Sequence, residues 1–352
     1  MKLVRKTQAV LLGVDISSTA IKVLQLSRSG ERYRVEHYAV EPLPFNAVVE
    51  KSVADYDQVA EAIKRALAKS GSKLKTAAAA VAGASVITKL IPMPADLTED
   101  ELEAQVELEA ANYIPYPIDE VNIDFESVGP MPGAADMQQV LLVAARSEEV
   151  SSRQSVLEMA GLSAKVIDVE AFAIENAFSL MAPELGISPG GLVALVDIGA
   201  TLTTLNILRD GRSQYSREQA FGGKQLTEEI MRRYGLAWEE AERAKRQGGL
   251  PDSYETDVLE PFRETLVQQI SRLLQFYYAS SEYNRVEQVV LLGGCASIPR
   301  IAQQVEEQLG VPTSLANPLA QMTLSGRVQA HGLAHDAPSL MIACGLALRS
   351  FD

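Results

Sequence analysis

The apolar and polar positions follow one pattern near the start of the chain and repeat it just past the middle. In both places an apolar, β-rich run ends at a single aspartate, a turn of small residues follows, and a second β-rich run returns. The first copy spans Leu12–Leu26 and contains Asp15, and the second spans Leu195–Leu208 and contains Asp197. Each copy predicts a buried strand, a tight hairpin and a returning strand.

Further predicted elements follow each hairpin in the same order. After the first, residues 33–40 predict a third strand, apolar spacing before Gly71 predicts a helix, and residues 77–81 predict a buried strand. After the second, strands and helices are predicted at residues 214–220, 223–234, 262–283, 289–292 and 301–309, with a Lys/Glu/Arg-rich segment and a loop before the helix at 262–283. The last predicted element is an apolar helix at 339–351, in which Gly345 allows close packing. Three strands followed by a helix and a strand is the order of a ribonuclease-H-like half, so the expected class is α/β.

The pattern changes near Pro92 and Pro94. Thr98 and Glu101 have the spacing of a capping box and predict the start of an acidic helix. Strands at 121–125 and 140–145, a turn-rich loop at 129–133 and a helix at 148–160 follow. These elements predict a compact α+β insertion in the first half.

The two hairpin turns carry the candidate chemistry. They consist of small or hydroxylated residues, Ser17, Ser18 and Thr19 in the first and Gly199, Ala200 and Thr201 in the second. A ligand can approach the backbone N–H groups of such turns closely, and consecutive N–H groups form an anion-binding concavity. Two hairpins that face each other therefore predict a polyphosphate site, in which Asp15 and Asp197 hold Mg²⁺ through water.

Composition excludes several other classes of protein. The chain has 352 residues and a formal net charge of −14, so a nucleic-acid partner is not expected. Its two cysteines, Cys295 and Cys344, lie in apolar surroundings and are expected to be reduced core thiols. His331 and His335 share a helical spacing, but two histidines are too few for a zinc site.

No apolar run reaches the roughly 18 residues that a membrane span needs. Met1–Val14 begins with basic residues, but its apolar run is short and meets Asp15, so it is expected to lead into the first strand. If the protein works at a membrane, a partner recruits it there, and no direct membrane insertion is expected.

Three motifs together resemble the actin, Hsp70 and sugar-kinase superfamily. They are Asp15–Thr19 as a first phosphate loop, Asp197–Thr201 as a second, and Leu291–Ser297 as an adenosine motif, with Asp168–Ala173 and Ala343–Ala347 similar to the two connecting helices. More narrowly, Tyr113–Pro117, Gly222–Ile230 and Gly345–Asp352 resemble the PilM family of cytoplasmic, actin-like type IV pilus assembly proteins.

This resemblance implies the actin-like ATPase fold, with two ribonuclease-H-like lobes and an FtsA-type α+β insertion, subdomain 1C, in the first lobe. The expected units are subdomain 1A at 1–94, inserted subdomain 1C of SHS2 type at 95–163, the 1A connecting helix at 164–188, subdomain 2A at 189–224 and 285–336, subdomain 2B at 225–284, and a C-terminal helix returning to 1A at 337–352.

The resemblance also implies that ATP with Mg²⁺ binds between the lobes. The additional residues expected at ATP are Lys22 at phosphate, Gly222, Gly223, Lys224 and Glu228 near ribose and base, and Gly293, Gly294 and Ser297 at adenosine. Glu170 is the candidate for positioning an attacking water, although a salt-bridged glutamate is an equally open interpretation. Ser17 stands where the superfamily commonly has glycine, so binding is expected and hydrolysis is expected to be slow or absent.

A peptide partner is implied as well. In the PilM family the cytoplasmic N-terminal tail of the inner-membrane protein PilN lies in a groove between subdomains 1A and 1C, where Tyr113 or Tyr116 is expected here. The expected location is the cytoplasm at the inner face of the inner membrane, with indirect contact to other pilus and motor proteins. Three alternatives stay open: a sugar-type kinase, for which no base motif is found, an FtsA-like scaffold, whose amphipathic terminal helix this chain lacks, and a site without nucleotide.

Overall fold

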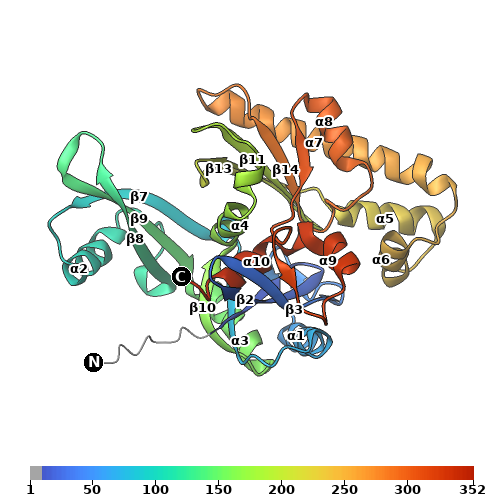
Figure 1. Ribbon diagram of the computed structural model, residues 1–352, viewed down its shortest axis with the longest axis horizontal. Coiled ribbons are helices and arrows are strands. Elements are labelled where there is room, and N and C mark those ends of the chain that lie inside the picture. Colours follow the sequence, from blue (N-terminus) through green and yellow to red (C-terminus); the bar gives the residue numbers. More distant parts are fainter. Residues whose placement is uncertain (1–9) are drawn as a thin grey trace.

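Two lobes of similar topology stand one above the other in the computed structural model, which describes residues 10–352 (Figure 1). The start of the predicted lead-in at Met1–Val14 falls on residues 1–9, outside the described residues. The first lobe is built on a six-stranded sheet in the order β10-β6-β1-β2-β3-β16, and the second on a five-stranded sheet in the order β13-β12-β11-β14-β15. In each, the predicted hairpin provides the central strand and its neighbour.

The strands of the first sheet are β1 (Leu12–Ile16), β2 (Ala20–Ser29), β3 (Arg32–Pro42), β6 (Thr76–Val81), β10 (Ser163–Val169) and β16 (Thr323–Leu324). Those of the second sheet are β11 (Leu192–Ile198), β12 (Thr203–Arg209), β13 (Arg212–Gln219), β14 (Gln288–Leu292) and β15 (Thr313–Leu315). Both sheets begin with three antiparallel strands, after which β6 joins β1, and β14 joins β11, in parallel. The repeated order confirms the two ribonuclease-H-like halves that the sequence predicts.

Helices surround the two sheets, and a short hairpin with strands of two residues each precedes the first helix. The helices of the two lobes are α1 (Tyr56–Ser70), α3 (Ser147–Met159), α4 (Glu170–Ser179), α5 (Gly223–Tyr234), α6 (Trp238–Gln247), α7 (Glu260–Ser280), α8 (Ile301–Leu309), α9 (Ala330–Asp336) and α10 (Met341–Leu348). The hairpin pairs β4 (Val48–Val49) with β5 (Ser52–Val53). Among residues 10–352, no helix combines the length and the apolar character that crossing a membrane requires.

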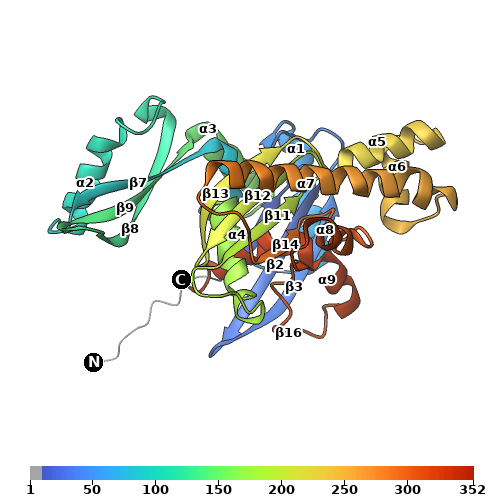
Figure 2. The ribbon, with the colours of Figure 1, turned by 90° about the horizontal axis from the view of Figure 1, so that it is seen from above.

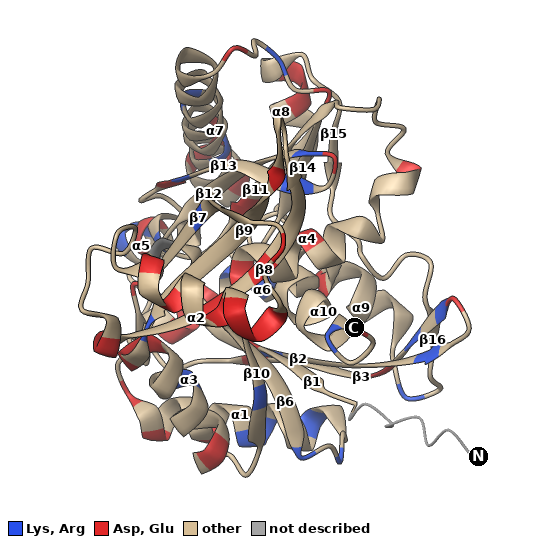
Figure 3. Cartoon of the chain, turned by 90° about the vertical axis from the view of Figure 1, so that its left-hand side faces the viewer, with Lys and Arg blue, Asp and Glu red and all other residues tan. Residues whose placement is uncertain are grey.

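A third unit projects from the first lobe, at the opposite end of the molecule from α6 (Figures 1 and 2). It consists of β7 (Val86–Pro94), β8 (Val121–Met131), β9 (Ala134–Arg146) and α2 (Glu99–Ala110), with the strands in the order β7-β9-β8. Thr98 and Glu101 form the predicted capping box at the start of α2. Acidic side chains gather on this helix (Figure 3).

Three elements differ from the sequence prediction. β7 was not expected as a strand, because Pro92 and Pro94 lack N–H donors; it tolerates them as an edge strand that pairs only with β9. β8 continues to Met131 through part of the predicted loop. The Lys/Glu/Arg-rich segment forms the helix α6. Only Ala241 is buried in it, so the segment lacks the apolar periodicity from which a helix is predicted.

The helix α10 is the centre of the packing. All its residues are buried, and it contacts both β1 and α4. A Cβ atom on Gly345 would lie 1.8 Å from the Ala173 carbonyl oxygen of α4, and one on Gly13 would lie 2.1 Å from the Ala343 oxygen. The expected close packing at Gly345 is therefore confirmed, and the two cysteines are free and buried as expected.

We expect Gly345→Ala to destabilise the protein by about 2–3 kcal/mol, because the added methyl group forces α10 away from α4. Urea denaturation followed by circular dichroism measures this change. Gly326→Ala is the control, since a Cβ atom there meets nothing within 4 Å, and its effect should stay within about 0.5 kcal/mol. Equal losses in the two variants would contradict the packing argument.

Candidate functional site

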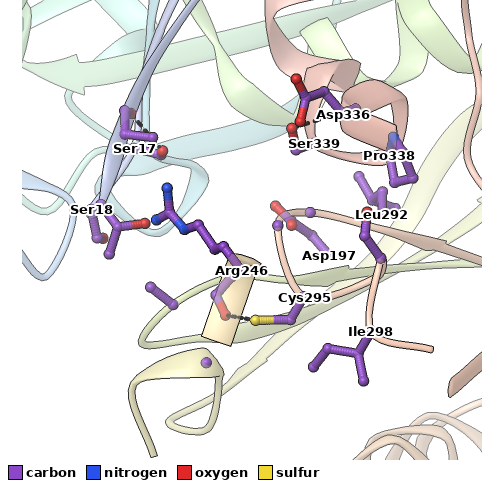
Figure 4. Close-up of a pocket in the computed structure, with 18 of the residues that line it drawn as sticks. Ser17, Ser18, Asp197, Arg246, Leu292, Cys295, Ile298, Asp336, Pro338 and Ser339 are labelled. Carbon is purple, nitrogen blue, oxygen red and sulfur yellow. Dashed lines mark hydrogen bonds between the residues drawn. The ribbon is translucent and has the colours of Figure 1, made fainter. Parts of the chain in front are cut away.

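A cavity of about 470 Å³ lies between the two lobes and is lined by both hairpin turns (Figure 4). Asp15 and Asp197 both line it, so the structure brings the two repeated motifs to one place. The other predicted residues that line it are Ser17, Ser18, Thr19, Lys22, Gly199, Ala200, Thr201, Gly223, Gly293, Gly294 and Ser297. The two hairpin turns therefore face one cavity, so that a single ligand could contact both of them.

Four predicted residues do not line this cavity. Lys224 lines a second, outer cavity and lies 3.9 Å from Glu228, which lines neither. Glu170 begins α4 and forms an ion pair with Lys51 at 3.0 Å. Gly222 packs against the second hairpin, as described below.

The cavity also has lining residues that sequence reasoning missed. They include Lys51, Glu242, Lys245, Arg246, Tyr254, His335, Asp336 and Ser339. Glu242, Lys245 and Arg246 follow the i, i+3, i+4 spacing of one helical face, which was a usable signal in the charged segment that forms α6. Lys51 gave no local signal, since only the tertiary fold brings the β4–β5 hairpin to the cleft.

The first hairpin carries its own cation. Asp15 and Lys22 stand opposite each other in the β1–β2 ladder, and the Lys22 ammonium donates to the Asp15 carboxylate at 2.7 Å. It also lies 3.3 Å from the Ser17 hydroxyl. Asp15 and Lys22 are only 2% and 8% exposed, so Lys22 supplies the positive charge that a buried aspartate requires.

The second hairpin differs in this respect. Among residues 10–352, no lysine, arginine or histidine lies within salt-bridge distance of Asp197, and burial raises the pKa of its carboxyl group. A Cβ atom on Gly293 would lie 2.3 Å from the Asp197 Oδ1 atom, and Gly293 has a φ of +89°. Glycine is therefore required at 293 both for space and for backbone conformation.

Backbone hydrogen bonds join the second hairpin to the start of α5. The Gly223 N–H donates to the Gly199 oxygen at 3.0 Å, and the Lys224 N–H donates to the Ala200 oxygen at 2.7 Å. A Cβ atom on Gly222 would lie 2.5 Å from the Gly199 oxygen. The small residues at 222 and 223 therefore let α5 pack on the turn and hold its shape.

Helix α6 contributes a charged network on the other side of the cavity. The Lys245 ammonium donates to the Thr227 hydroxyl at 2.6 Å and also contacts Glu242. Burial opposes ionisation of Glu242, but Lys245 and the hydrogen bonds outweigh it and lower the pKa of this carboxyl group. Arg246 extends across the cavity toward Ser18 of the first hairpin (Figure 4).

The second cavity, of about 330 Å³, adjoins the first and shares Ser18, Thr201 and Arg246 with it. Phe45 of the first lobe and Trp238 of α6 line it, and their ring centroids are 4.5 Å apart. This aromatic contact joins the two lobes beside the hairpin tips.

The comparisons with known proteins agree with this geometry. The family model described as type IV pilus assembly protein PilM matches residues 13–351. The chain belongs to the PilM family. A chain of a solved PilM–PilN type IV pilus biogenesis complex is 30% identical to it, with a TM-score of 0.79 and coverage of 98% of this chain and 99% of that one.

A second solved structure shows how widely the fold occurs. The ethanolamine utilization protein EutJ from Carboxydothermus hydrogenoformans is 18% identical, with a TM-score of 0.55 and coverage of 96% of this chain and 89% of that one. This likeness is one of fold alone. The actin-like ATPase fold expected from the sequence is confirmed, and membership of the PilM family does not favour the sugar-kinase alternative.

The two tyrosines expected at a PilN groove lie in different surroundings. Tyr113 follows α2 and packs against the core of the three-stranded unit. Tyr116 is 38% exposed, and the Arg146 guanidinium lies 4.6 Å from its ring centroid. Of the two side chains, Tyr116 is the one available to a partner.

We expect Asp197→Asn to stabilise the ligand-free protein at pH 7 by about 1 kcal/mol, because it removes a desolvated negative charge. Since the folded-state pKa of Asp197 is raised, the stability this carboxyl contributes is present at low pH and is lost as the pH rises through that pKa. The gain should therefore shrink as the pH falls toward ~4.

Thermal unfolding between these pH values measures the difference. The control is Asp57→Asn, which changes an exposed aspartate in the first turn of α1 and should bring no gain. A loss of stability in Asp197→Asn at neutral pH would show that the carboxylate is adequately paired in the free protein.

Proposed function

We propose that this protein is a nucleotide-dependent scaffold of type IV pilus assembly, which binds Mg·ATP between its lobes and a PilN-type peptide on its first lobe. The observation that carries the proposal is the pair of hairpin turns lining one cavity, Asp15 on one side and Asp197 on the other. Membership of the PilM family supports the pilus assignment.

The residues of the cavity suit the parts of a nucleotide. Backbone N–H groups of both hairpin turns would bind phosphate oxygens, with Lys22 as the cation beside the first turn. A Cβ atom on Gly294 would meet nothing within 4 Å, so this glycine leaves an open surface for adenosine, and Tyr254 and Ile298 offer apolar contact near it. Because the expected contacts Lys224 and Glu228 lie outside this cavity, we propose that α6 rather than the start of α5 meets the ribose or base.

Magnesium fits the carboxylates unequally. Asp15 is neutralised by Lys22 at 2.7 Å, whereas the partly buried Asp197 lacks a cation at salt-bridge distance. A hydrated Mg²⁺ would supply the missing positive charge there. We therefore propose Asp197 as the principal aspartate toward Mg²⁺, with Asp15 acting mainly through Lys22.

Fast hydrolysis has little support in the geometry. Glu170, the candidate for positioning water, does not line the cavity and is held by Lys51 at 3.0 Å. We propose that Glu170 anchors Lys51, and that ATP is turned over slowly or not at all. A bound nucleotide would then act by favouring a closed arrangement of the lobes.

The partner proposal rests on the relative in the solved PilM–PilN complex, which this chain matches over nearly its whole length. We propose that the cytoplasmic N-terminal tail of a PilN protein binds where the three-stranded unit, our candidate for subdomain 1C, joins the first lobe. Arg146 lies at this junction, as the last residue of β9 before α3, and its guanidinium contacts the ring of Tyr116. Such binding would recruit the protein to the inner face of the inner membrane.

Calorimetry tests the nucleotide site. We expect the protein to bind Mg·ATP, Asp197→Asn to weaken binding about tenfold or more, and Asp57→Asn to leave it unchanged. The single tryptophan of the chain, Trp238, contacts Phe45 across the cleft, so its fluorescence should report lobe closure. Unaltered affinity in Asp197→Asn would refute its role, and a phosphorylated product from a sugar panel would favour a kinase.

Titration of a PilN tail peptide tests the groove. We expect Tyr116→Ala to weaken binding about five- to thirtyfold, as loss of an aromatic contact does. Phe276→Ala is a matched control, since Phe276 is 41% exposed and also carries a guanidinium, that of Arg217, 3.8 Å from its ring centroid. It lies on α7 of the second lobe, so equal losses in both variants would rule out the proposed location.

A further inference from the structure

The β4–β5 hairpin contains the least favourable backbone of the cleft. Its two-residue turn, Glu50-Lys51, has φ values of +48° and +70°. Two-residue hairpins with positive φ at both central positions strongly favour Asn-Gly or similar pairs, because other side chains are strained in this conformation. Glutamate and lysine are thus poor choices for the turn itself, and strain of this kind points to a use for a side chain.

The Lys51 side chain supplies that use, because it reaches the nucleotide cavity. It lines the cavity together with Asp15 and Asp197, is 19% exposed, and forms an ion pair with Glu170 at 3.0 Å. Burial disfavours its positive charge, but the carboxylates of Glu170, Asp197 and Asp15 outweigh burial and raise the pKa of its ammonium group. Lys51 is therefore a cation on the wall of the cavity that the two hairpin aspartates also line.

Helix α3 holds the strained turn in place. Arg153 is 1% exposed, donates through Nη2 to the Lys51 carbonyl oxygen and donates through Nε to the Ala80 oxygen at 3.2 Å. One turn earlier on the helix, Glu149 accepts a hydrogen bond of 2.7 Å from the Ser52 hydroxyl. These contacts hold the turn at the Lys51 carbonyl group and at Ser52, directly after the residue whose side chain enters the cleft.

We propose that Lys51 binds the terminal phosphate of a nucleoside triphosphate and thereby distinguishes it from the diphosphate, and that Arg153 is its positioning residue. The inference rests on the nucleotide-binding function proposed above. Lys22 is already committed to Asp15 and Ser17, whereas the partner of Lys51, Glu170, lies outside the cavity wall. To meet a terminal phosphate, Lys51 would exchange the Glu170 carboxylate for the phosphate, and no ion pair between two residues that line the cavity would be broken.

The charge balance of this end of the cavity supports the assignment. Asp15, Asp197 and Glu170 are opposed by Lys22 and Lys51. Removing the positive charge of Lys51 leaves carboxylates that repel a triphosphate more strongly than a diphosphate, since the extra phosphate brings additional negative charge. The loss should accordingly fall on the triphosphate.

The experiment compares ATP with ADP, each with Mg²⁺, by calorimetry on the full chain. Lys51→Asn keeps a residue that tolerates positive φ and removes the ammonium group. We expect its affinity for ATP to fall roughly tenfold or more, as for loss of a charge-assisted hydrogen bond, and its affinity for ADP to change less than about twofold. Lys51→Arg should restore most of the preference for ATP.

Glu50→Asn is the matched control. Glu50 occupies the other positive-φ position of the same turn, is exposed and lines neither cavity. Glu50→Asn should relieve the backbone strain of the turn without changing the ratio of the affinities for ATP and ADP. If Glu50→Asn alters the ratio as Lys51→Asn does, the effect belongs to the turn conformation and the proposal for Lys51 is wrong.

Arg153→Met tests the positioning role at a temperature well below its unfolding transition. We expect it to lower the ATP-to-ADP affinity ratio in the same direction as Lys51→Asn, whereas a purely structural role would weaken both nucleotides alike. Equal losses for ATP and ADP in Lys51→Asn would overturn the terminal-phosphate contact. Binding of neither nucleotide by the unmodified protein would be a different result, since it would overturn the nucleotide function itself.

Discussion

The position of α10 against both β1 and α4 is the constraint on which the two-lobed arrangement depends. Side chains of α10 share one apolar core with residues of both sheets, including Leu24 from the first and Leu195 and Val290 from the second. Such a core is close-packed only if α10 lies near its neighbours, and Gly13 permits its approach to β1 while Gly345 permits its approach to α4. The facing of the two hairpins across one cavity is a consequence of this packing.

Within the cavity, the two copies of the hairpin motif have become chemically different. The first pairs its aspartate with Lys22 from the returning strand, while the second leaves Asp197 without a cation at salt-bridge distance and packs it against the backbone of Gly293. A partly buried carboxylate without such a partner is unfavourable in the free protein. It is tolerated here because the site suits a bound cation, which would relieve the same cost on binding. The apparent symmetry of the sequence thus gives an asymmetric site.

The sequence alone predicted what depends on local pattern. Alternation, hairpin turns and caps predicted both ribonuclease-H-like halves, the capping box at Thr98 and the close approach at Gly345. The repeated aspartates predicted which residues meet at the cavity. The sequence did not predict β7, because prolines normally argue against a strand. It also did not predict that α6 would line the cavity, because the single buried residue of this helix, Ala241, gives little hydrophobic periodicity. Lys51 could not have been predicted, since a two-residue hairpin carries no pattern and its position depends on contacts with α3.

The contacts of α3 with the Lys51 turn also connect the proposed peptide site to the nucleotide cavity. The strand β9 of the projecting unit ends at Arg146 and α3 begins at the next residue, so Arg153 lies two turns from the junction that carries Tyr116. The side chain of Arg153 meets the turn that places Lys51 in the cleft. A peptide that shifts the junction would therefore act on α3 directly, and hydrogen bonds of Arg153 and Glu149 join α3 to the turn that carries Lys51. Coupling of this kind is reciprocal by thermodynamic necessity, so a nucleotide that displaces Lys51 from Glu170 would alter peptide affinity by the same factor as the peptide alters nucleotide affinity. Such coupling requires that the turn can adopt two conformations. The strained backbone of the turn makes its present conformation easier to leave than that of an unstrained hairpin.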